Sequence, residues 1–243
     1  MRVLVYNIAY GTGAPESLYR NFSTAHRYVR TKDTHIRKII DFISKADPDI
    51  LGLVEVDTGS YRTKYVNQVE FIAGHIKHHH QSSIKYNHGF LSKRMPIVRK
   101  QANAILTKLK VPDGNFHFFP AGFKRLLIEI DIAGIRFFLV HLSVQKRVRK
   151  LQLTHLAKLA KGLKPVIIAG DFNTFSGPKE IHELQQELGL VNPNTDNLPT
   201  FPSWKPSRQL DFILCSHQIK IQHFEVPKVQ FSDHLPLLLD FKM

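Results

Sequence analysis

One order of sequence features occurs twice in this chain, and it limits how the chain can fold. A segment with helical periodicity at 34–44 is followed by a proline and the apolar run ILGLVE, which ends at Glu55. A second such segment at 147–161 is followed by a proline and the run VIIAGD, which ends at Asp171. The two parts are too dissimilar for a sequence repeat, but their common order predicts two comparable halves. Each half would deliver one carboxylate at the C-terminal end of a buried strand.

Apolar runs of strand length recur along the whole chain. We expect strands at Val3–Asn7, Ile50–Val56, Ala102–Thr107, Leu126–Ile132, Ile135–Leu142, Val166–Gly170, Leu210–Cys215 and Pro236–Phe241. Apolar residues at helical spacing predict helices over 34–44, 65–76 and 147–161. A fourth helix is predicted from Pro178 to Gly189, since proline suits the first turn of a helix and glycine its C-terminal cap.

The chain is long enough for one sizeable hydrophobic core, with 243 residues of which 43% are hydrophobic. No linker rich in proline, glycine or serine divides it, so we expect a single domain over residues 1–243. No apolar run approaches the roughly 20 residues of a membrane span, and the N-terminus lacks a secretory signal. We therefore expect a soluble, cytoplasmic monomer. The single cysteine, Cys215, forbids an internal disulfide and fits a reducing compartment.

The charge balance favours an anionic partner. Lysine and arginine total 34 against 20 acidic residues, which gives a formal net charge of +14. A basic surface raises the local concentration of nucleic acid, anionic lipid headgroups or phosphorylated small molecules. The alternative is a merely basic protein, and charge does not choose among the anions.

Residues 77–100 contain few apolar side chains, several basic ones and three adjacent histidines, at 78–80. We expect an exposed basic loop here. Neighbouring side chains on an extended chain point in different directions. The three histidines therefore favour contact with an anion over a metal site.

Polar residues end or interrupt many of the apolar runs. They comprise carboxylates, amides and imidazoles: Asn7, Glu55, His141, Asp171, Asn173, Asp211, Asp233 and His234. A lone acid at the end of a strand is usually a turn former or a helix cap. The number of these residues and their chemistry favour a common site instead.

Several carboxylates at the ends of core strands would require a partner of opposite charge, because burying isolated charges costs several kcal/mol. A hard divalent cation such as Mg²⁺ prefers oxygen ligands and keeps waters that a phosphate can displace. Glu55 is the best candidate ligand, with Asn7 and Asp233 beside it. The histidines suit proton transfer better. We expect Asp211 to pair with His234 and to stabilise its imidazolium form.

The motifs that carry these residues resemble the endonuclease/exonuclease/phosphatase superfamily, which includes DNase I-like nucleases, abasic-site endonucleases, neutral sphingomyelinases and inositol polyphosphate 5-phosphatases. In chain order they are YNI, LVE, NAIL, VHLS, GDFN, LDFIL and SDHLP. They extend from near the first residue to near the last. GDFN and SDH together, in this order, are highly specific, whereas LVE or NAIL alone would be weak.

The resemblance implies an α/β (α+β) fold with four layers, in which two packed mixed β-sheets lie between helices. It also implies a Mg²⁺-dependent phosphoester hydrolase, with Mn²⁺ as a possible substitute. In such enzymes water attacks phosphorus in line with the departing oxygen.

The resemblance assigns roles to the residues that match its motifs. Glu55, Asn7 and Asp233 would hold the metal ion. Asp171 would orient or deprotonate the attacking water, and Asn173 would stabilise charge on a phosphate oxygen.

Further roles follow from the same resemblance, some with alternatives. His234, backed by Asp211, would act as the general base or polarise the phosphate, so two residues compete for the base. His141 would contact the phosphate or help the leaving group. Asn103 would contact phosphate or support a ligand, and Arg125 would clamp a phosphate oxygen.

Two departures from the abasic-site enzymes are visible. Those enzymes tend to have an acid two residues after the first asparagine, where this chain has Ala9. They also tend to have an aromatic residue where His141 stands. Both differences argue against a dedicated abasic-site repair enzyme.

Substrate contacts are predicted from residues near the motifs. Phe201 and Trp204 either stack on a base or headgroup, or anchor their own loop. Arg62 would reach a phosphate. The basic residues after His141 (Lys146, Arg147, Arg149 and Lys150) either line a groove or are solvated charges at the start of a helix. Nucleic acid is favoured as the substrate; phospholipid or another small phosphoester is the alternative. A non-enzymatic anion-binding protein is the weakest hypothesis.

Overall fold

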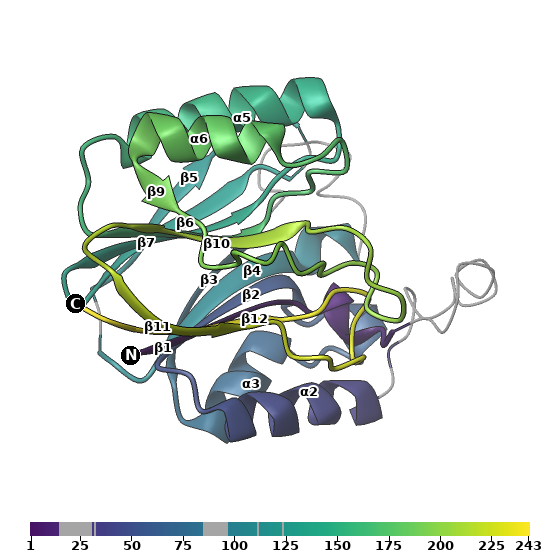
Figure 1. Ribbon diagram of the computed structural model, residues 1–243. Coiled ribbons are helices and arrows are strands. Elements are labelled where there is room, and N and C mark those ends of the chain that lie inside the picture. The colour runs from purple at the N-terminus through teal and green to yellow at the C-terminus, as the bar shows by residue number, and fades with distance from the viewer. Residues whose placement is uncertain (15–30, 32, 85–96, 111, 123) are drawn as a thin grey trace.

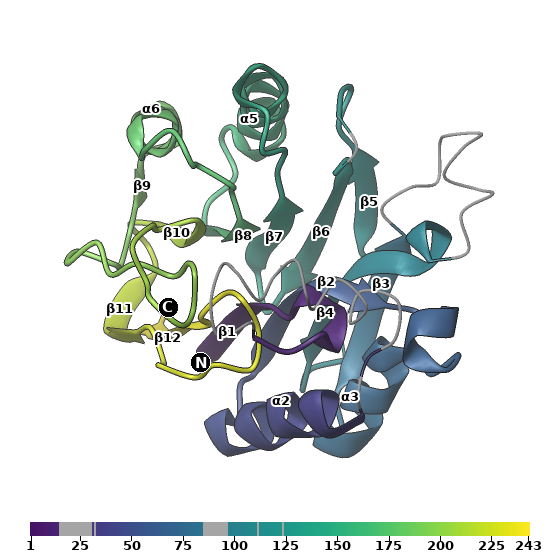
Figure 2. The ribbon, with the colours of Figure 1, turned by 90° about the vertical axis from the view of Figure 1, so that its right-hand side faces the viewer.

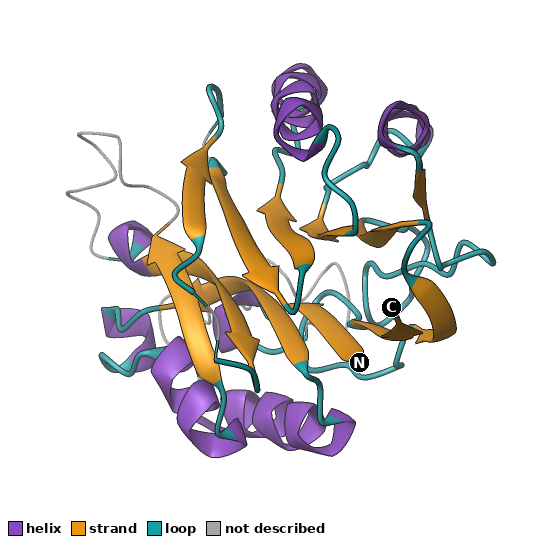
Figure 3. Cartoon of the chain, turned by 90° about the vertical axis from the view of Figure 1, so that its left-hand side faces the viewer, coloured by secondary structure: helices purple, strands orange, loops and turns teal. Residues whose placement is uncertain are grey.

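Two six-stranded β-sheets lie face to face, and a pair of helices covers the outer face of each (Figure 1). The computed structural model describes residues 1–14, 31, 33–84, 97–110, 112–122 and 124–243. Figures 2 and 3 show the same four layers from the two sides, with helices on the outside and strands between them. The predicted four-layer sandwich is confirmed.

The first sheet has the strand order β11-β12-β1-β2-β4-β3. Its strands are β1 (Arg2–Asn7), β2 (Ile50–Asp57), β3 (His79–Ile84), β4 (Gln101–Thr107), β11 (Lys220–Glu225) and β12 (Leu237–Lys242). The second sheet has the order β5-β6-β7-β8-β10-β9. Its strands are β5 (Asn115–Phe118), β6 (Leu126–Ile132), β7 (Ile135–His141), β8 (Val166–Asp171), β9 (Leu190–Val191) and β10 (Asp211–Ser216).

The two sheets have equivalent centres. Strands β1 and β2 pair in parallel, as do β7 and β8, and one long helix connects the members of each pair. A parallel pair requires such a crossover, because its second strand must start again at the same edge. The two halves predicted from the sequence are thus two βαβ units. Each unit brings the C-terminal ends of its two parallel strands to the same edge of its sheet.

Four helices form where apolar periodicity predicts them: α2 (Asp33–Ala46), α3 (Gln68–Ile76), α5 (Lys146–Ala160) and α6 (Lys179–Leu188). The α3 helix starts later than predicted. Tyr65 adopts a left-handed φ of 65° and is 75% exposed. Asn67 caps the helix instead, since its side chain accepts a hydrogen bond from the amide of Val69. At the end of α6, Gly189 adopts the left-handed cap conformation.

Three layers of apolar side chains hold the sandwich together. One lies between the sheets and includes Val5, Leu139 and Ile213. A second joins the first sheet to α2 and α3, and a third joins the second sheet to α5 and α6. Apolar burial on both faces explains why the central strands are continuous hydrophobic runs rather than alternating ones.

The prediction of an exposed basic loop over 77–100 is wrong for the strand at 79–84 and for His78, whereas His79 and His80 are exposed as predicted. Residues 79–84 form β3, which pairs with β4 at the edge of the first sheet. His78 is buried, and its two ring nitrogens contact the carbonyls of Ile76 and Pro48 at 2.8 Å each. His78 is therefore a structural residue rather than an anion contact. Residues 85–96 lie outside the described part of the chain.

Three other strands were not predicted. In β11 nearly every residue is exposed, β5 is half exposed, and β9 has two residues. These segments lack a buried apolar run, so their sequences do not predict strands. They form strands because they pair with a neighbouring strand. Among the described helices, none is both long and apolar enough to cross a membrane.

Candidate active site

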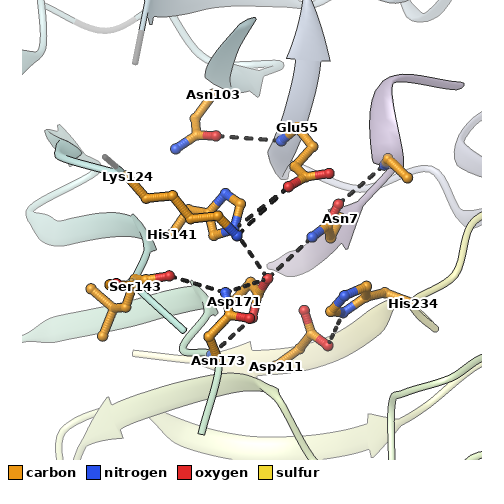
Figure 4. Close-up of polar contacts among 12 residues, drawn as sticks. Asn7, Glu55, Asn103, Lys124, His141, Ser143, Asp171, Asn173, Asp211 and His234 are labelled. Atoms are coloured by element: carbon orange, nitrogen blue, oxygen red, sulfur yellow. Dashed lines mark hydrogen bonds and ion pairs between the residues drawn. The ribbon is translucent and has the colours of Figure 1, made fainter. Parts of the chain in front are cut away.

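Polar side chains from both sheets meet at one end of the sandwich (Figure 4). In the second sheet the strand register sets them side by side: His141 on β7 lies opposite Asp171 on β8, which lies opposite Asp211 on β10. In the first sheet Asn7 is the last residue of β1, and Glu55 lies near the C-terminal end of β2. The predicted site residues at strand ends thus come together from five strands.

Asp171 lies at the centre of this site and is fully enclosed. Its Oδ1 accepts a hydrogen bond from the amide of Asn173 at 2.9 Å, and its Oδ2 accepts from Asn173 Nδ2 at 3.0 Å and from Asn7 Nδ2 at 3.2 Å. His141 Nε2 lies 3.3 Å from the same oxygen. Burial alone would raise the pKa of Asp171, but the charge of His234 and the contact with His141 outweigh burial and lower it. Asp171 is therefore held as a carboxylate.

The backbone beside Asp171 is possible only with glycine. Gly170 has a φ of +138°, and a Cβ built there would lie 2.0 Å from the carbonyl oxygen of Val140 on β7. Asn173, three residues after Gly170, has a left-handed φ of 53°. Its Nδ2 also donates to the carbonyl of Leu142. The GDFN motif therefore combines a close strand approach with a turn that folds the Asn173 amide back onto Asp171.

Glu55 occupies a strained position in β2. Its φ is +58°, and the pairing of β2 with β4 shifts register between Leu53 and Val56. A β-bulge of this kind re-aims a side chain, and bulges and strained residues are frequent at functional sites. Asn103 on β4 accepts a hydrogen bond from the Glu55 amide at 3.4 Å, while its buried Nδ2 has no hydrogen-bond partner among the described residues.

The predicted pair of Asp211 and His234 is present. Asp211 Oδ2 lies 2.8 Å from His234 Nδ1 and also accepts a hydrogen bond from Thr200 Oγ1 at 2.6 Å. Burial would lower the pKa of His234, but the charges of Asp211 and Asp171 outweigh it and raise the pKa to about 10. His234 is an imidazolium at neutral pH, and its Nδ1 faces Asp211.

Asp233 is a further carboxylate of the site, and its charge interacts with that of Glu55. Ser232 Oγ donates a hydrogen bond to Asp233 Oδ1 at 3.2 Å. Burial raises the pKa of Asp233; the charge of His234 opposes this shift, and the charges of Glu55 and Asp171 add to it. Two carboxylates that disfavour each other's charge are a suitable place for a cation.

The donor set fits a hard divalent cation. Glu55 and Asp233 would contribute carboxylate oxygens, and Asn7 would contribute an amide oxygen, which accepts a hydrogen bond from the Ala9 amide at 3.1 Å. A second group also has ligand-type atoms, all within 4.8 Å of one another: Asp171, Asp211 and His234. The hydrogen bond between Asp211 and His234 already engages two members of this second group.

A cation that the sequence did not indicate lies among these groups. The ammonium of Lys124 contacts His141 Nε2 and lies 3.8 Å from Glu55 Oε1 (Figure 4). The neighbouring Arg125, predicted as the phosphate clamp, donates from Nε to the carbonyl of Phe119 at 2.6 Å. Lys124 and Arg125 are adjacent and both basic, just before β6, and they differ in the direction of their side chains. No sequence motif predicts that direction.

Arg62 is not brought to the site. Its side chain is 1% exposed, and its Nη2 lies 2.8 Å from Asp57 Oδ2. Its guanidinium carbon lies 3.9 Å from the centre of the Tyr10 ring. Because Asp57 and Tyr10 enclose the guanidinium, its contacts are structural and leave no room for a substrate phosphate.

Arg149 is also buried, although the sequence suggested a groove-lining residue. Its Nη1 donates to the carbonyls of Ser143, Val144 and Asn173 at 2.9–3.0 Å. Its Nη2 lies 2.6 Å from a carboxylate oxygen of Glu180 on α6. One guanidinium therefore connects the turn after His141 to the turn after Asp171. Lys146, Arg147 and Lys150 remain exposed on the same helix.

Trp204 lies in a group of aromatic rings that ends at His234. The ring centres of Phe175 and Phe201 are 5.8 Å apart, those of Phe201 and Trp204 are 6.4 Å apart, and those of Phe201 and His234 are 4.9 Å apart. Phe175 is 37% exposed. The rings thus contact His234 of the site and also one another. This arrangement is compatible with stacking on a base and with anchoring of their own loop.

The four layers and the paired βαβ units define a DNase I-like fold. The family model described as the Endonuclease/Exonuclease/phosphatase family matches residues 4–234 of the chain. The chain belongs to this family, whose members are generally hydrolases of phosphoesters.

Individual proteins are similar to this chain in sequence or in fold. The chain is 30% identical over 157 residues to a UPF0294 protein of Yersinia enterocolitica, covering 63% of this chain and 53% of that protein. It spans about half the length of the curated relatives it matches. An endonuclease/exonuclease/phosphatase of Beutenbergia cavernae has a similar structure, with a TM-score of 0.75 and 18% identity over 100% of this chain and 71% of that one. An AP endonuclease of Archaeoglobus fulgidus has a TM-score of 0.67 and 15% identity, with both chains fully covered.

Proposed function

We propose that this protein is a divalent-metal-dependent phosphodiesterase that cleaves nucleic acid by attack of water on phosphorus. One observation carries the proposal: a buried carboxylate, Asp171, is surrounded by amides and imidazoles from both sheets at one end of the sandwich. Burying such a cluster costs folding free energy unless every charged group has a well-placed partner. Stability alone therefore does not explain why the chain has it. Its groups match those needed to bind and activate water next to a phosphate.

Glu55, Asp233 and Asn7 are the residues that would hold the metal ion. When bound, a divalent cation would supply Lewis-acid stabilisation of negative charge on phosphate oxygens. Mg²⁺ or Mn²⁺ suits an all-oxygen donor set. Burial raises the pKa of Asp233, the charge of His234 opposes this shift, and the charge of Glu55 adds to it. A bound cation would stabilise the charged form of Asp233, which supports a metal ion at this place.

Asp171 and His234 have different charges at neutral pH, which supports different tasks. We assign the orientation and deprotonation of water to Asp171, which is held as a carboxylate by its amide donors. We assign to His234 the binding of a phosphate oxygen. Its Nδ1 contacts Asp211, so its Nε2 is the ring nitrogen that would donate to the phosphate. Asn173 and His141 lie on either side of Asp171 and would contact the remaining oxygens.

Nucleic acid is the favoured substrate on two grounds. The net charge of +14 suits a polyanion. The aromatic rings that continue from His234 through Phe201 to Trp204 offer faces on which a base can stack. The known neighbours in fold include an AP endonuclease, but an identity of 15% transfers only the fold.

The proposal is tested by incubating the purified protein with Mg²⁺ and supercoiled plasmid, single-stranded DNA, RNA and a panel of phospholipids. We expect cleavage of nucleic acid by the wild type, and loss of at least about a hundredfold in rate for Asp171→Asn and His234→Ala. Circular dichroism of both variants should match the wild type. Release of lipid headgroups without nucleic-acid cleavage would assign the same chemistry to a phospholipid. Near-normal turnover by either variant would remove the role assigned to that residue.

A further inference from the structure

Lys124 is a cation in the site to which the proposed mechanism gives no task. Its ammonium contacts His141 Nε2 and lies 3.8 Å from Glu55 Oε1, a distance too long for a hydrogen bond. Its side chain is 25% exposed, against 17% for Glu55 and 1% for His141. The Lys124 side chain is thus partly accessible to solvent, more so than its two neighbours in the site.

The position of Lys124 is built into the fold. Gln152 on α5 is completely buried, and its Nε2 donates to the carbonyls of Lys124 at 2.8 Å and Ala121 at 3.0 Å. The Oε1 of Gln152 accepts a hydrogen bond from the amide of Ser143 at 2.8 Å. One side chain thus ties the backbone of Lys124 to the turn that follows His141. This tie keeps the ammonium beside the imidazole.

The charge balance of the site requires such a group. Four carboxylates face or adjoin the place where a phosphate would bind: Glu55, Asp171, Asp211 and Asp233. A phosphoester adds at least one further negative charge. Lysine provides a compact positive charge with three donors, and it commonly binds phosphate as a point charge.

We propose that Lys124 is a further catalytic residue whose ammonium binds an oxygen of the scissile phosphate beside His141. This inference rests on the proposed phosphodiesterase function. With a divalent cation held by Glu55, like-charge repulsion would disfavour the ammonium near Glu55, and a phosphate oxygen would be the alternative partner. Lys124 and His234 lie on opposite sides of Asp171 (Figure 4), so both would face a phosphate bound beside Asp171.

Binding of inorganic phosphate tests this role without turnover. Isothermal titration calorimetry in the presence of Mg²⁺ compares the wild type with Lys124→Ala, Lys124→Met and Lys124→Arg. We expect Ala and Met to weaken phosphate binding about tenfold to a hundredfold, because a hydrogen bond to a charged group is lost. Arg should retain most of the affinity. Met keeps most of the apolar stem, so it reports on the ammonium even where Ala unfolds the loop.

The matched control removes one positive charge elsewhere. Lys158 is exposed near the far end of α5, so Lys158→Ala should bind phosphate as the wild type does. Equal phosphate affinity in the wild type and in the Met variant would overturn the proposal, as would absence of phosphate binding by the wild type. Unchanged phosphate affinity with tighter Mg²⁺ binding would make Lys124 a counter-ion of Glu55 only.

The same variants separate this inference from the proposed function. With a nucleic-acid substrate, loss of the ammonium should lower kcat more than it raises KM, as expected for contacts that strengthen in the transition state. If the wild type cleaves no phosphoester, the proposed function fails, while the calorimetry still reports whether Lys124 binds phosphate. If the wild type cleaves nucleic acid and the Met variant does so equally well, only the role of Lys124 fails.

Discussion

His234 Nδ1 lies 2.8 Å from Asp211 Oδ2, although the two residues are 23 positions apart in the chain. Asp211 begins β10, and His234 lies in the loop before β12, so the pair joins the two sheets across the site. The charges of Asp211 and Asp171 outweigh the effect of burial and raise the pKa of His234 to about 10. The imidazole is therefore held in its charged form by a partner from the other sheet.

Asp211→Asn should lower the pKa of His234, because the amide keeps the shape of the carboxylate but loses its charge. The NMR titration of the imidazole in metal-free protein measures this directly. We expect a value near 10 in the wild type and a clearly lower one in the variant. The other histidines serve as an internal reference. An unchanged His234 titration in the variant would show that Asp211 does not hold the proton.

The same pair predicts how stability depends on pH. The pKa of His234 in the folded protein lies above the ordinary value of 6.5, so the folded state binds more protons between pH 6.5 and 10. The contribution of this pair to the free energy of unfolding is full below pH 6.5 and is lost as the pH rises towards 10. Urea unfolding across this range should show a smaller loss in Asp211→Asn than in the wild type.

Mg²⁺ should raise the thermal midpoint of the wild type, because a ligand that binds only the folded state stabilises it. At a hundred times the dissociation constant the gain is about 2.7 kcal/mol. Glu55→Gln should reduce this gain sharply, since a neutral amide replaces the carboxylate expected to bind the ion. Differential scanning calorimetry with and without a chelator gives the comparison. An equal Mg²⁺ effect in the Glu55→Gln variant would exclude Glu55 as a principal ligand.

Gly170→Ala should destabilise the fold by about 3 kcal/mol or more, because a Cβ at φ +138° would overlap the carbonyl of Val140. The control is Gly74→Ala in α3, where a Cβ meets no atom within 4 Å. There alanine should be neutral or should stabilise by about 0.5–1 kcal/mol, since glycine is the poorer helix former. Chemical denaturation measures both changes, and similar values for the two variants would contradict the close approach of β7 and β8.

Arg149→Ala should lower the free energy of unfolding by about 3–5 kcal/mol, because it leaves buried carbonyls and Glu180 without their partner. Arg147→Ala on the exposed face of the same helix should change it by less than about 0.5 kcal/mol. Arg149→Lys should be intermediate, since lysine cannot reproduce the planar fork of donors. Equal stabilities of the two alanine variants would show that Arg149 does not join the turn after His141 to the turn after Asp171.

The sequence motifs predicted the positions of those site residues that follow a buried strand. Asp171 comes after five residues of core strand, so its place at the open end of the sheet follows from local sequence. The same holds for Asn7 and His141. The partners of these residues could not be predicted this way. Thr200, which donates to Asp211, belongs to a loop with no periodic pattern.

The sequence by itself determined the two βαβ halves, the strands of the core and the order of polar residues at their ends, because apolar periodicity and strand length are local properties. Only the tertiary structure decided which basic side chains lie beside the candidate site. Arg62 and Arg149 are enclosed by partners from other segments, while Lys124, next to the predicted Arg125, faces His141. A cation is buried or exposed according to which distant carboxylates and carbonyls surround it, and that depends on packing rather than on neighbouring residues.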